Sequence, residues 1–299
     1  MIVGGRQILG DRAFGIVLLI PAFAIIVGII LFPLLDAARL SITSTNLINI
    51  RKQPYIGLRN YQQIFTDPTY WQVVGNTFFI TGASVAASVL IGMALALALN
   101  AMVTVRGLLR ALFIVPWLVP GVVIGVTWNW LLSTETGVVN YIIRALGIAS
   151  ENLPWLADAT LSMAAVNGVF VWSSVPFIMV TLLGGLQAIP TELVEAAIVD
   201  GATFGQRFRR VVLPLMLPII TIATILRVIY TMQNFVIVYM LTQGGPGFAT
   251  ETLALYVYET AFNSARLGKA SAIGVTWFFY SLLFVVIYLK LVDREERQA

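Results

Sequence analysis

Six long apolar stretches recur along the chain, and segments richer in polar and charged residues separate them. Each stretch is long enough to cross a hydrocarbon core of about 30 Å, which needs about 20 helical residues. The pattern predicts an all-α integral membrane protein with six transmembrane helices. The predicted spans lie near residues 14–35, 74–99, 111–132, 160–187, 213–241 and 271–289.

Composition agrees with the apolar pattern and narrows the function classes. Hydrophobic residues make up 59% of the 299 positions and charged residues 11%, whereas soluble domains carry about 25% charged residues. The chain has no cysteine and no histidine, which removes disulfides, Cys nucleophiles, His bases and imidazole metal ligands together. We therefore expect no catalytic site and no metal site. The formal net charge of +4 is spread over several short segments instead of one basic block, so we also expect no nucleic-acid partner.

The distribution of Lys and Arg predicts the orientation in the membrane. With the N-terminus inside, the shorter cytoplasmic segments hold ten basic residues and the longer external ones hold seven, as the positive-inside rule requires. We expect cytoplasmic ends at 1–13 and 290–299 around one transmembrane domain at 14–289. The first span lacks a small-residue cleavage site, which favours a retained helix over a signal peptide.

The polar segment 190–214, between the fourth and fifth spans, predicts two short helices. Thr191 is expected to cap the first helix, with Glu192 and Glu195 near its positive end. Gly201 follows Asp200 where a turn would end that helix. Such a helix suits docking into a groove on a partner protein, and it equally suits lying on the lipid surface.

This segment carries a resemblance to a known family. Glu195-Ala-Ala-Ile-Val-Asp-Gly-Ala, followed by Leu213-Pro214 and Pro218, resembles the EAA loop of binding-protein-dependent ABC transporter permeases. Further motifs resemble the carbohydrate-importing branch, which includes the first membrane subunits of maltose and glycerol-phosphate importers. They are Ile56-Gly-Leu-Arg-Asn-Tyr61, Asn76-Thr77, Pro116-Trp117 with Pro120 and Trp128, Gly184-Gly-Leu-Gln-Ala-Ile-Pro190 and Leu241-Thr-Gln-Gly-Gly-Pro246.

The resemblance implies a MetI-like fold and a multi-pass subunit of a bacterial or archaeal inner membrane. It implies three kinds of partner: a second related permease, two copies of an ATPase subunit that binds ATP and Mg, and an external solute-binding protein. The coupling role in that family maps onto Glu195, Ala196, Ala197, Asp200 and Gly201. The chain lacks the extra helices and the large external insertion of the maltose subunit.

A candidate solute pathway follows from polar residues inside the spans, where charge is costly. Arg227, Tyr230, Thr231 and Asn234 are spaced to share one face of the fifth span. These positions, and Trp172, Ser173, Ser174 and Phe177 in the fourth span, match the family's sugar site. We expect a neutral di- or oligosaccharide, with glycerol 3-phosphate or a related anion as the alternative because of Arg227. The alternative role of these polar residues is helix packing.

An ion-coupled secondary transporter is the rival class. It would normally need an intramembrane acid or histidine, or an unwound helix that binds sodium, and no Asp or Glu falls within the predicted spans. ATP hydrolysis is not expected in this chain, because its nearest phosphate-loop lookalike, Leu267-Gly-Lys-Ala-Ser271, has Asn263 in place of the first glycine. A partner ATPase is the expected energy source.

Overall fold

Helices dominate the computed structural model, which describes residues 2–3, 6–7, 11–102 and 106–296. Within those ranges, β1 (Ile2–Val3) and β2 (Arg6–Gln7) form a two-stranded antiparallel sheet. The all-α prediction is confirmed, because a pairing of two residues with two does not change the fold class. The predicted cytoplasmic ends include residues 1, 4–5, 8–10 and 297–299, which lie outside the described residues.

Apolar helices occur at all six predicted places. Five helices in the described ranges are each long and apolar enough to cross a membrane, and a bent pair brings the number to six if it counts as one span. The observed helices extend past the predicted spans by a few residues at most ends. The five are Leu18–Leu40, Pro68–Ala101, Ala159–Ala188, Phe204–Gln233 and Leu267–Lys290.

The third predicted span, 111–132, is broken rather than continuous. Helix α5 (Arg106–Leu118) and helix α6 (Gly121–Leu131) meet at a bend of 93°. Pro120 precedes α6 with an extended backbone, ψ 141°, and a proline supplies no N–H to continue the preceding helix. Pro176, by contrast, lies inside the unbroken helix α8 (Ala159–Ala188).

The fifth predicted span, 213–241, also differs from the structure at both ends. It begins earlier, because α10 (Phe204–Arg207), the π-helical η2 (Phe208–Val212) and α11 (Leu213–Gln233) run on as one apolar helix. It ends earlier too, at Gln233, and a separate helix α12 (Val236–Leu241) follows. The Asn129 side-chain amide of α6 donates to the carbonyl of Leu241 at 2.7 Å, so the far halves of two broken spans pack together.

The chain divides into two compact units, of which the first comprises 1–66 and 257–276. The apolar side chains described along Leu18–Leu40 are largely exposed, and none of that span's most apolar window is buried. Hydrogen bonds join the loop after α2 to α3 and to the start of α14. The unit contains α1 (Asp11–Ile25), η1 (Ile26–Leu31), α2 (Phe32–Leu40), α3 (Arg59–Phe65), η3 (Glu259–Asn263) and the first ten residues of α14 (Leu267–Glu296).

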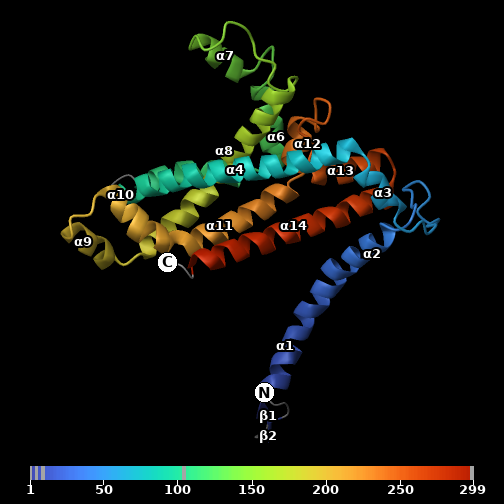
Figure 1. Cartoon of the computed structure of the whole chain (residues 1–299), viewed down its shortest axis with the longest axis horizontal. Helices are drawn as coiled ribbons and strands as arrows, with labels where there is room; N and C mark the ends of the chain where they lie inside the picture. Colours follow the sequence, from blue (N-terminus) through green and yellow to red (C-terminus); the bar gives the residue numbers. More distant parts are fainter. Residues whose placement is uncertain (1, 4–5, 8–10, 103–105, 297–299) are drawn as a thin grey trace. The chain divides into compact units, whose positions relative to one another are not determined.

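The second unit, 67–256 and 277–299, holds the main hydrophobic core. Helix α4 (Pro68–Ala101) packs along α8, and α11 packs against both (Figure 1). Ile178, Met179 and Leu182 of α8 are fully buried against Ala96 of α4 and Met216 of α11. This core fixes the ends of α4 and α8 beside the polar segment that follows α8. The unit's shorter helices are α7 (Val138–Ala145), α9 (Thr191–Val199) and α13 (Leu253–Tyr258).

Candidate functional site

Helix α9 is the short helix predicted between the fourth and fifth spans. Its N-cap is Pro190, whose backbone is extended at ψ 126° and which provides no side-chain cap. The prediction that Thr191 caps this helix is therefore wrong, because Thr191 is already its first helical residue. Glu192 lies in the first turn, where the positive end of the helix dipole favours an acid.

Gly201 ends α9, as the sequence predicts. Its φ is +75°, a left-handed conformation that costs other residues about 1 kcal/mol. The N–H of Gly201 donates to Ile198 O and the N–H of Ala202 donates to Ala197 O, both at 2.9 Å. These two bonds form a Schellman motif, which satisfies the last carbonyls of the helix and turns the chain sharply at Asp200.

The surface of α9 is unusually open for a helix with apolar side chains. Glu195, Ala196 and Asp200 are exposed and Ala197 is half-buried. Val199 is 86% exposed and Ile198 51% exposed. A short helix that leaves apolar and acidic side chains uncovered within its own chain is suited to burial against another surface.

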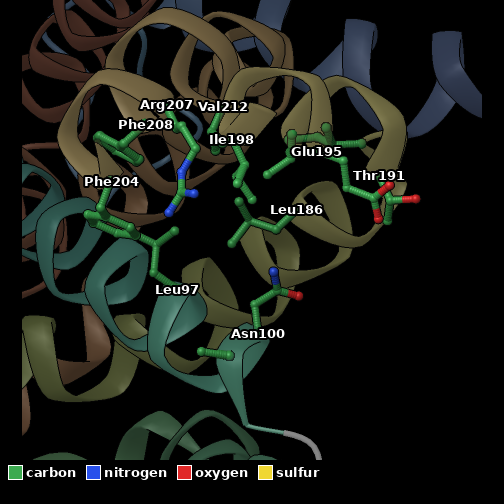
Figure 2. Close-up of a pocket in the computed structure, with 13 residues that line it drawn as sticks. Leu97, Asn100, Leu186, Thr191, Glu195, Ile198, Phe204, Arg207, Phe208 and Val212 are labelled. Atoms are coloured by element: carbon green, nitrogen blue, oxygen red, sulfur yellow. The ribbon is translucent and has the colours of Figure 1, made fainter. Parts of the chain in front are cut away.

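A groove lies beneath α9, on the side that faces the ends of α4 and α8 (Figure 2). Its volume is about 370 Å³. Figure 2 shows the Arg207 side chain pointing into the groove, with Leu186 of α8 and Asn100 of α4 across from it. Glu195 also lines the groove, so it holds one acid and one base among apolar walls. The contribution of α4 was not predicted, although Asn100 ends its apolar run.

The helix α10, which leads back into the core, begins with a side-chain cap. Thr203 is the N-cap of α10, and its side chain and that of Gln206 form a capping box. Gln206 Oε1 accepts from the Thr203 N–H at 2.8 Å. Because α10, η2 and α11 are continuous, the turn at Gly201 connects directly to a helix of the core.

The predicted pathway residues of the fifth span are only partly brought together. Arg227 and Thr231 are buried, at 4% exposure each, whereas Tyr230 is 49% exposed. The guanidinium carbon of Arg227 lies 4.3 Å from the centre of the Tyr230 ring, a cation–π geometry. Arg227 Nε and Nη2 have no hydrogen-bond partner among the described residues.

Asn234 lies at the end of the helix that carries these residues. Helix α11 ends at Gln233, and Asn234 has an extended backbone with ψ 101°. Its side-chain oxygen accepts from the N–H of Ile237 at 3.0 Å, so Asn234 occupies the break between α11 and α12.

The fourth-span candidates divide into two aromatic rings, exposed at Trp172 and half-buried at Phe177, and two buried hydroxyls. Trp172 is 38% exposed, and its ring meets Trp128 of α6 edge to face at 5.6 Å between centres. Phe177 packs on Trp117 of α5 at 5.7 Å. Ser173 and Ser174 are buried and both donate to the carbonyl of Phe170 within their own helix. Their hydroxyls therefore satisfy the backbone of α8.

Groups for bond-breaking chemistry are not assembled at either place. Among the described residues, no three of Asp, Glu, His and Cys come together in a way that could hold a metal ion. The groove offers one carboxylate, one guanidinium and apolar walls, and the residues around Arg227 offer aromatic rings and hydrogen-bond donors. Both arrangements offer groups for binding a ligand or a partner.

An all-helical membrane chain that presents a short exposed helix between its fourth and fifth long apolar helices has the architecture of a transporter's membrane subunit. The family model described as "Binding-protein-dependent transport system inner membrane component" matches residues 88–298. The chain belongs to this family. It is a multi-pass inner-membrane protein and a transport subunit rather than an enzyme, and the rival interpretation as an ion-coupled secondary transporter is wrong.

Two relatives match almost the whole chain. The sulfoquinovosyl glycerol transport system permease protein SmoG of Agrobacterium fabrum is 35% identical, over 96% of this chain and 93% of its own. The trehalose/maltose transport system permease protein MalF of Thermococcus litoralis is 34% identical, over 94% of each.

The fold itself matches a solved importer. A chain of a bacterial alginate ABC transporter, solved in complex with an alginate pentasaccharide-bound periplasmic protein, superimposes with a TM-score of 0.81 over 95% of both chains. The two sequences are 20% identical, so this likeness concerns the fold, which is the MetI-like permease fold.

Proposed function

We propose that the chain forms half of the translocation pathway of an ATP-driven importer, beside a second related permease, for a sugar that an external binding protein delivers. In this proposal both termini are cytoplasmic and two copies of an ATPase subunit dock from that side. The observation that carries it is helix α9, which exposes Glu195 and ends in the Schellman turn at Gly201.

The geometry of α9 supports docking on an ATPase. Its exposed residues Glu195, Ile198 and Val199 would be covered by a groove on that subunit, in the helix-in-groove mode. Movement of the docked helix would pass through the turn at Gly201 into α10 and α11, which are continuous. ATP and Mg would bind the ATPase and favour its closed form, and only this differential affinity can drive alternating access.

A sugar as the solute is supported by the residues near the broken helices and by the relatives. SmoG is named for a sulfoquinovosyl glycerol and MalF for trehalose and maltose. Exposed aromatic rings at Trp172 and Tyr230 suit the apolar faces of a sugar ring. We propose a neutral di- or oligosaccharide as the first candidate.

An anionic sugar or glycerol derivative is the second candidate, and one observation favours it. Arg227 is buried in a span with Nε and Nη2 unpartnered, and a guanidinium matches the geometry of carboxylate, phosphate or sulfonate oxygens. An acceptor from the second permease would satisfy the same donors. Transport assays with matched neutral and anionic solutes distinguish these roles.

Site-directed crosslinking tests the coupling proposal directly. The chain has no cysteine, so Val199→Cys provides a single reactive thiol on the exposed face of α9. A short thiol-to-amine crosslinker in native membranes should join this variant to the ATPase subunit. Ser150→Cys, on an exposed loop after α7, is the matched control and should not give that product. Crosslinks from Val199→Cys only to lipid would instead identify α9 as a helix that lies on the membrane.

A further inference from the structure

A polar pocket of about 270 Å³ lies wholly within the first unit. Its cationic lining comes from two separate places in the sequence: Arg59 begins α3, while Arg266 precedes α14 and Lys269 lies in the first turn of α14. Thr45 and Asn46, from the loop after α2, complete its polar wall. None of the residues that line this pocket, all of them in the described part of the chain, is acidic.

Backbone contacts build this pocket and hold it in place. The N–H of Leu47 donates to Ala265 O at 2.9 Å, and the N–H of Gly268 donates to Thr45 O at 3.0 Å. The two segments approach so closely that a Cβ at Gly268 would lie 2.1 Å from the carbonyl oxygen of Thr43. The loop after α2 and the start of α14 are therefore fixed against each other.

A buried asparagine fixes the third wall. Asn60, which is 5% exposed, donates from Nδ2 to Ser41 O and Thr43 O at 2.8 Å each. These bonds tie α3 to the loop after α2 and so set the position of Arg59 next to Asn60. The cationic side chains are thus carried on a frame that is ordered before any ligand arrives, which lowers the entropic cost of binding.

The chemistry of the pocket selects an oxyanion. Arg59 and Arg266 are exposed at its mouth and Lys269 is half-buried. A guanidinium carries five N–H donors in a planar fork that matches phosphate oxygens, and Lys adds a compact charge. Hydroxyl and amide groups of Thr45 and Asn46 supply neutral hydrogen bonds.

The position of the pocket along the spans indicates where the oxyanion comes from. The candidate span Leu18–Leu40 ends four residues before Ser44, which lines the pocket, and the span Leu267–Lys290 contains Lys269 in its first turn. Both spans belong to the first unit at these ends. Residues at the ends of two membrane spans lie at the depth of the lipid headgroups.

We propose that this pocket binds the phosphate headgroup of an anionic phospholipid. The proposal does not depend on the solute or on the coupling role of α9, because it rests on the first unit alone. Bound lipid would bridge the loop after α2, α3 and the start of α14 through one headgroup.

Native mass spectrometry of the full chain tests this proposal. The detergent-purified chain would be titrated with dioleoyl phosphatidylglycerol or with zwitterionic dioleoyl phosphatidylcholine, and bound lipids counted. The pocket variant is Arg59→Gln with Arg266→Gln. The control, Arg51→Gln with Arg144→Gln, removes the same charge from exposed positions outside the pocket. A third variant, Arg59→Lys with Arg266→Lys, keeps the charge and guards against misfolding.

We expect phosphatidylglycerol to bind the wild type and the control alike, and the pocket variant about 25-fold more weakly, since each basic residue near an anionic headgroup contributes about a factor of five. The lysine variant should retain most of the affinity, and phosphatidylcholine should bind weakly throughout. Equal phosphatidylglycerol binding by the pocket and control variants would overturn the proposal. Displacement of the lipid by millimolar inorganic phosphate would overturn the lipid source and identify a site for a free anion.

Discussion

Gly201 has an unusual backbone conformation and lies within the most specific motif of the chain. Its φ is +75°, and a Cβ there would meet nothing within 4 Å. We predict that Gly201→Asp abolishes solute-stimulated ATPase activity of the assembled importer, at least tenfold, while the chain still inserts and assembles. The reason is that added bulk, charge and ~1 kcal/mol of backbone strain all fall on the docking turn.

The control for this prediction is Gly147→Asp. Gly147 has φ +70° and equally open surroundings, but it follows α7 instead of α9. The same strain and charge at Gly147 should leave stimulated ATPase activity nearly normal. Equal loss in both variants, or normal activity in Gly201→Asp, would contradict the coupling role of the turn.

Arg227 is predicted to act on the solute rather than on assembly. Arg227→Ala should change solute affinity or choice about tenfold, because hydrogen bonds to a charged group contribute about 1.5–3 kcal/mol. Solute-dependent uptake in proteoliposomes measures this. Arg144→Ala, at an exposed position, should leave uptake unchanged. Loss of the whole complex in Arg227→Ala would show that Arg227 pairs with a partner subunit.

Residue-level prediction succeeded where the signal was local and failed where it was not. Gly201 could be placed at a helix end because only glycine adopts its conformation freely. Asn234 could not be placed, because nothing in its seven-residue spacing from Arg227 reveals that α11 stops at Gln233. Thr191 was misplaced because Pro190, although it has no N–H, can itself occupy the N-cap.

The start of α10 offers a test at the level of one element. Thr203→Ala removes the capping box and should destabilise the first turn by ~1 kcal/mol. Hydrogen exchange of the amides at the start of α10 should become about fivefold faster. Thr191→Ala is the matched change in α9 and should alter exchange little, because Thr191 lies inside the helix and does not cap it. The opposite ranking of the two variants would contradict the assigned caps.

The long helices followed from hydropathy, but the breaks in two of them did not. The sequence is mostly apolar from Phe113 to Trp130 and on both sides of Asn234. The mean hydropathy of a window of about 20 residues therefore stays high across each break. The breaks are stabilised by contacts between distant parts of the chain. The bond from Asn129 to Leu241 O, at 2.7 Å, is one of them. Pro116 and Pro120 both lie in the third predicted span, and the sequence alone does not decide which of them bends the chain.

The groove beneath α9 likewise could not be predicted from local sequence. Glu195 and Arg207 lie in the recognised loop, but Asn100 and Leu186 reach the groove only because the core aligns the ends of α4 and α8. Tertiary packing, and not local pattern, brings such residues together.

At the scale of the whole molecule, the orientation is testable without background labelling, because the chain has no cysteine. Ser150→Cys should react with a membrane-impermeant maleimide in intact spheroplasts. Val199→Cys should react only after the membrane is permeabilised and the ATPase subunits are stripped from it. Both positions are exposed within the chain itself, so access then depends on the side of the membrane. The reverse pattern would contradict cytoplasmic termini.

The central claim is that this chain works only as part of a larger importer. Affinity purification of the tagged chain from its native membrane, followed by mass spectrometry and an ATPase assay of the recovered material, tests that claim most directly. The account predicts recovery of a second permease and an ATPase subunit, with ATP hydrolysis stimulated by a sugar and its binding protein. Recovery of the chain alone, in a form that still transports solute, would contradict it.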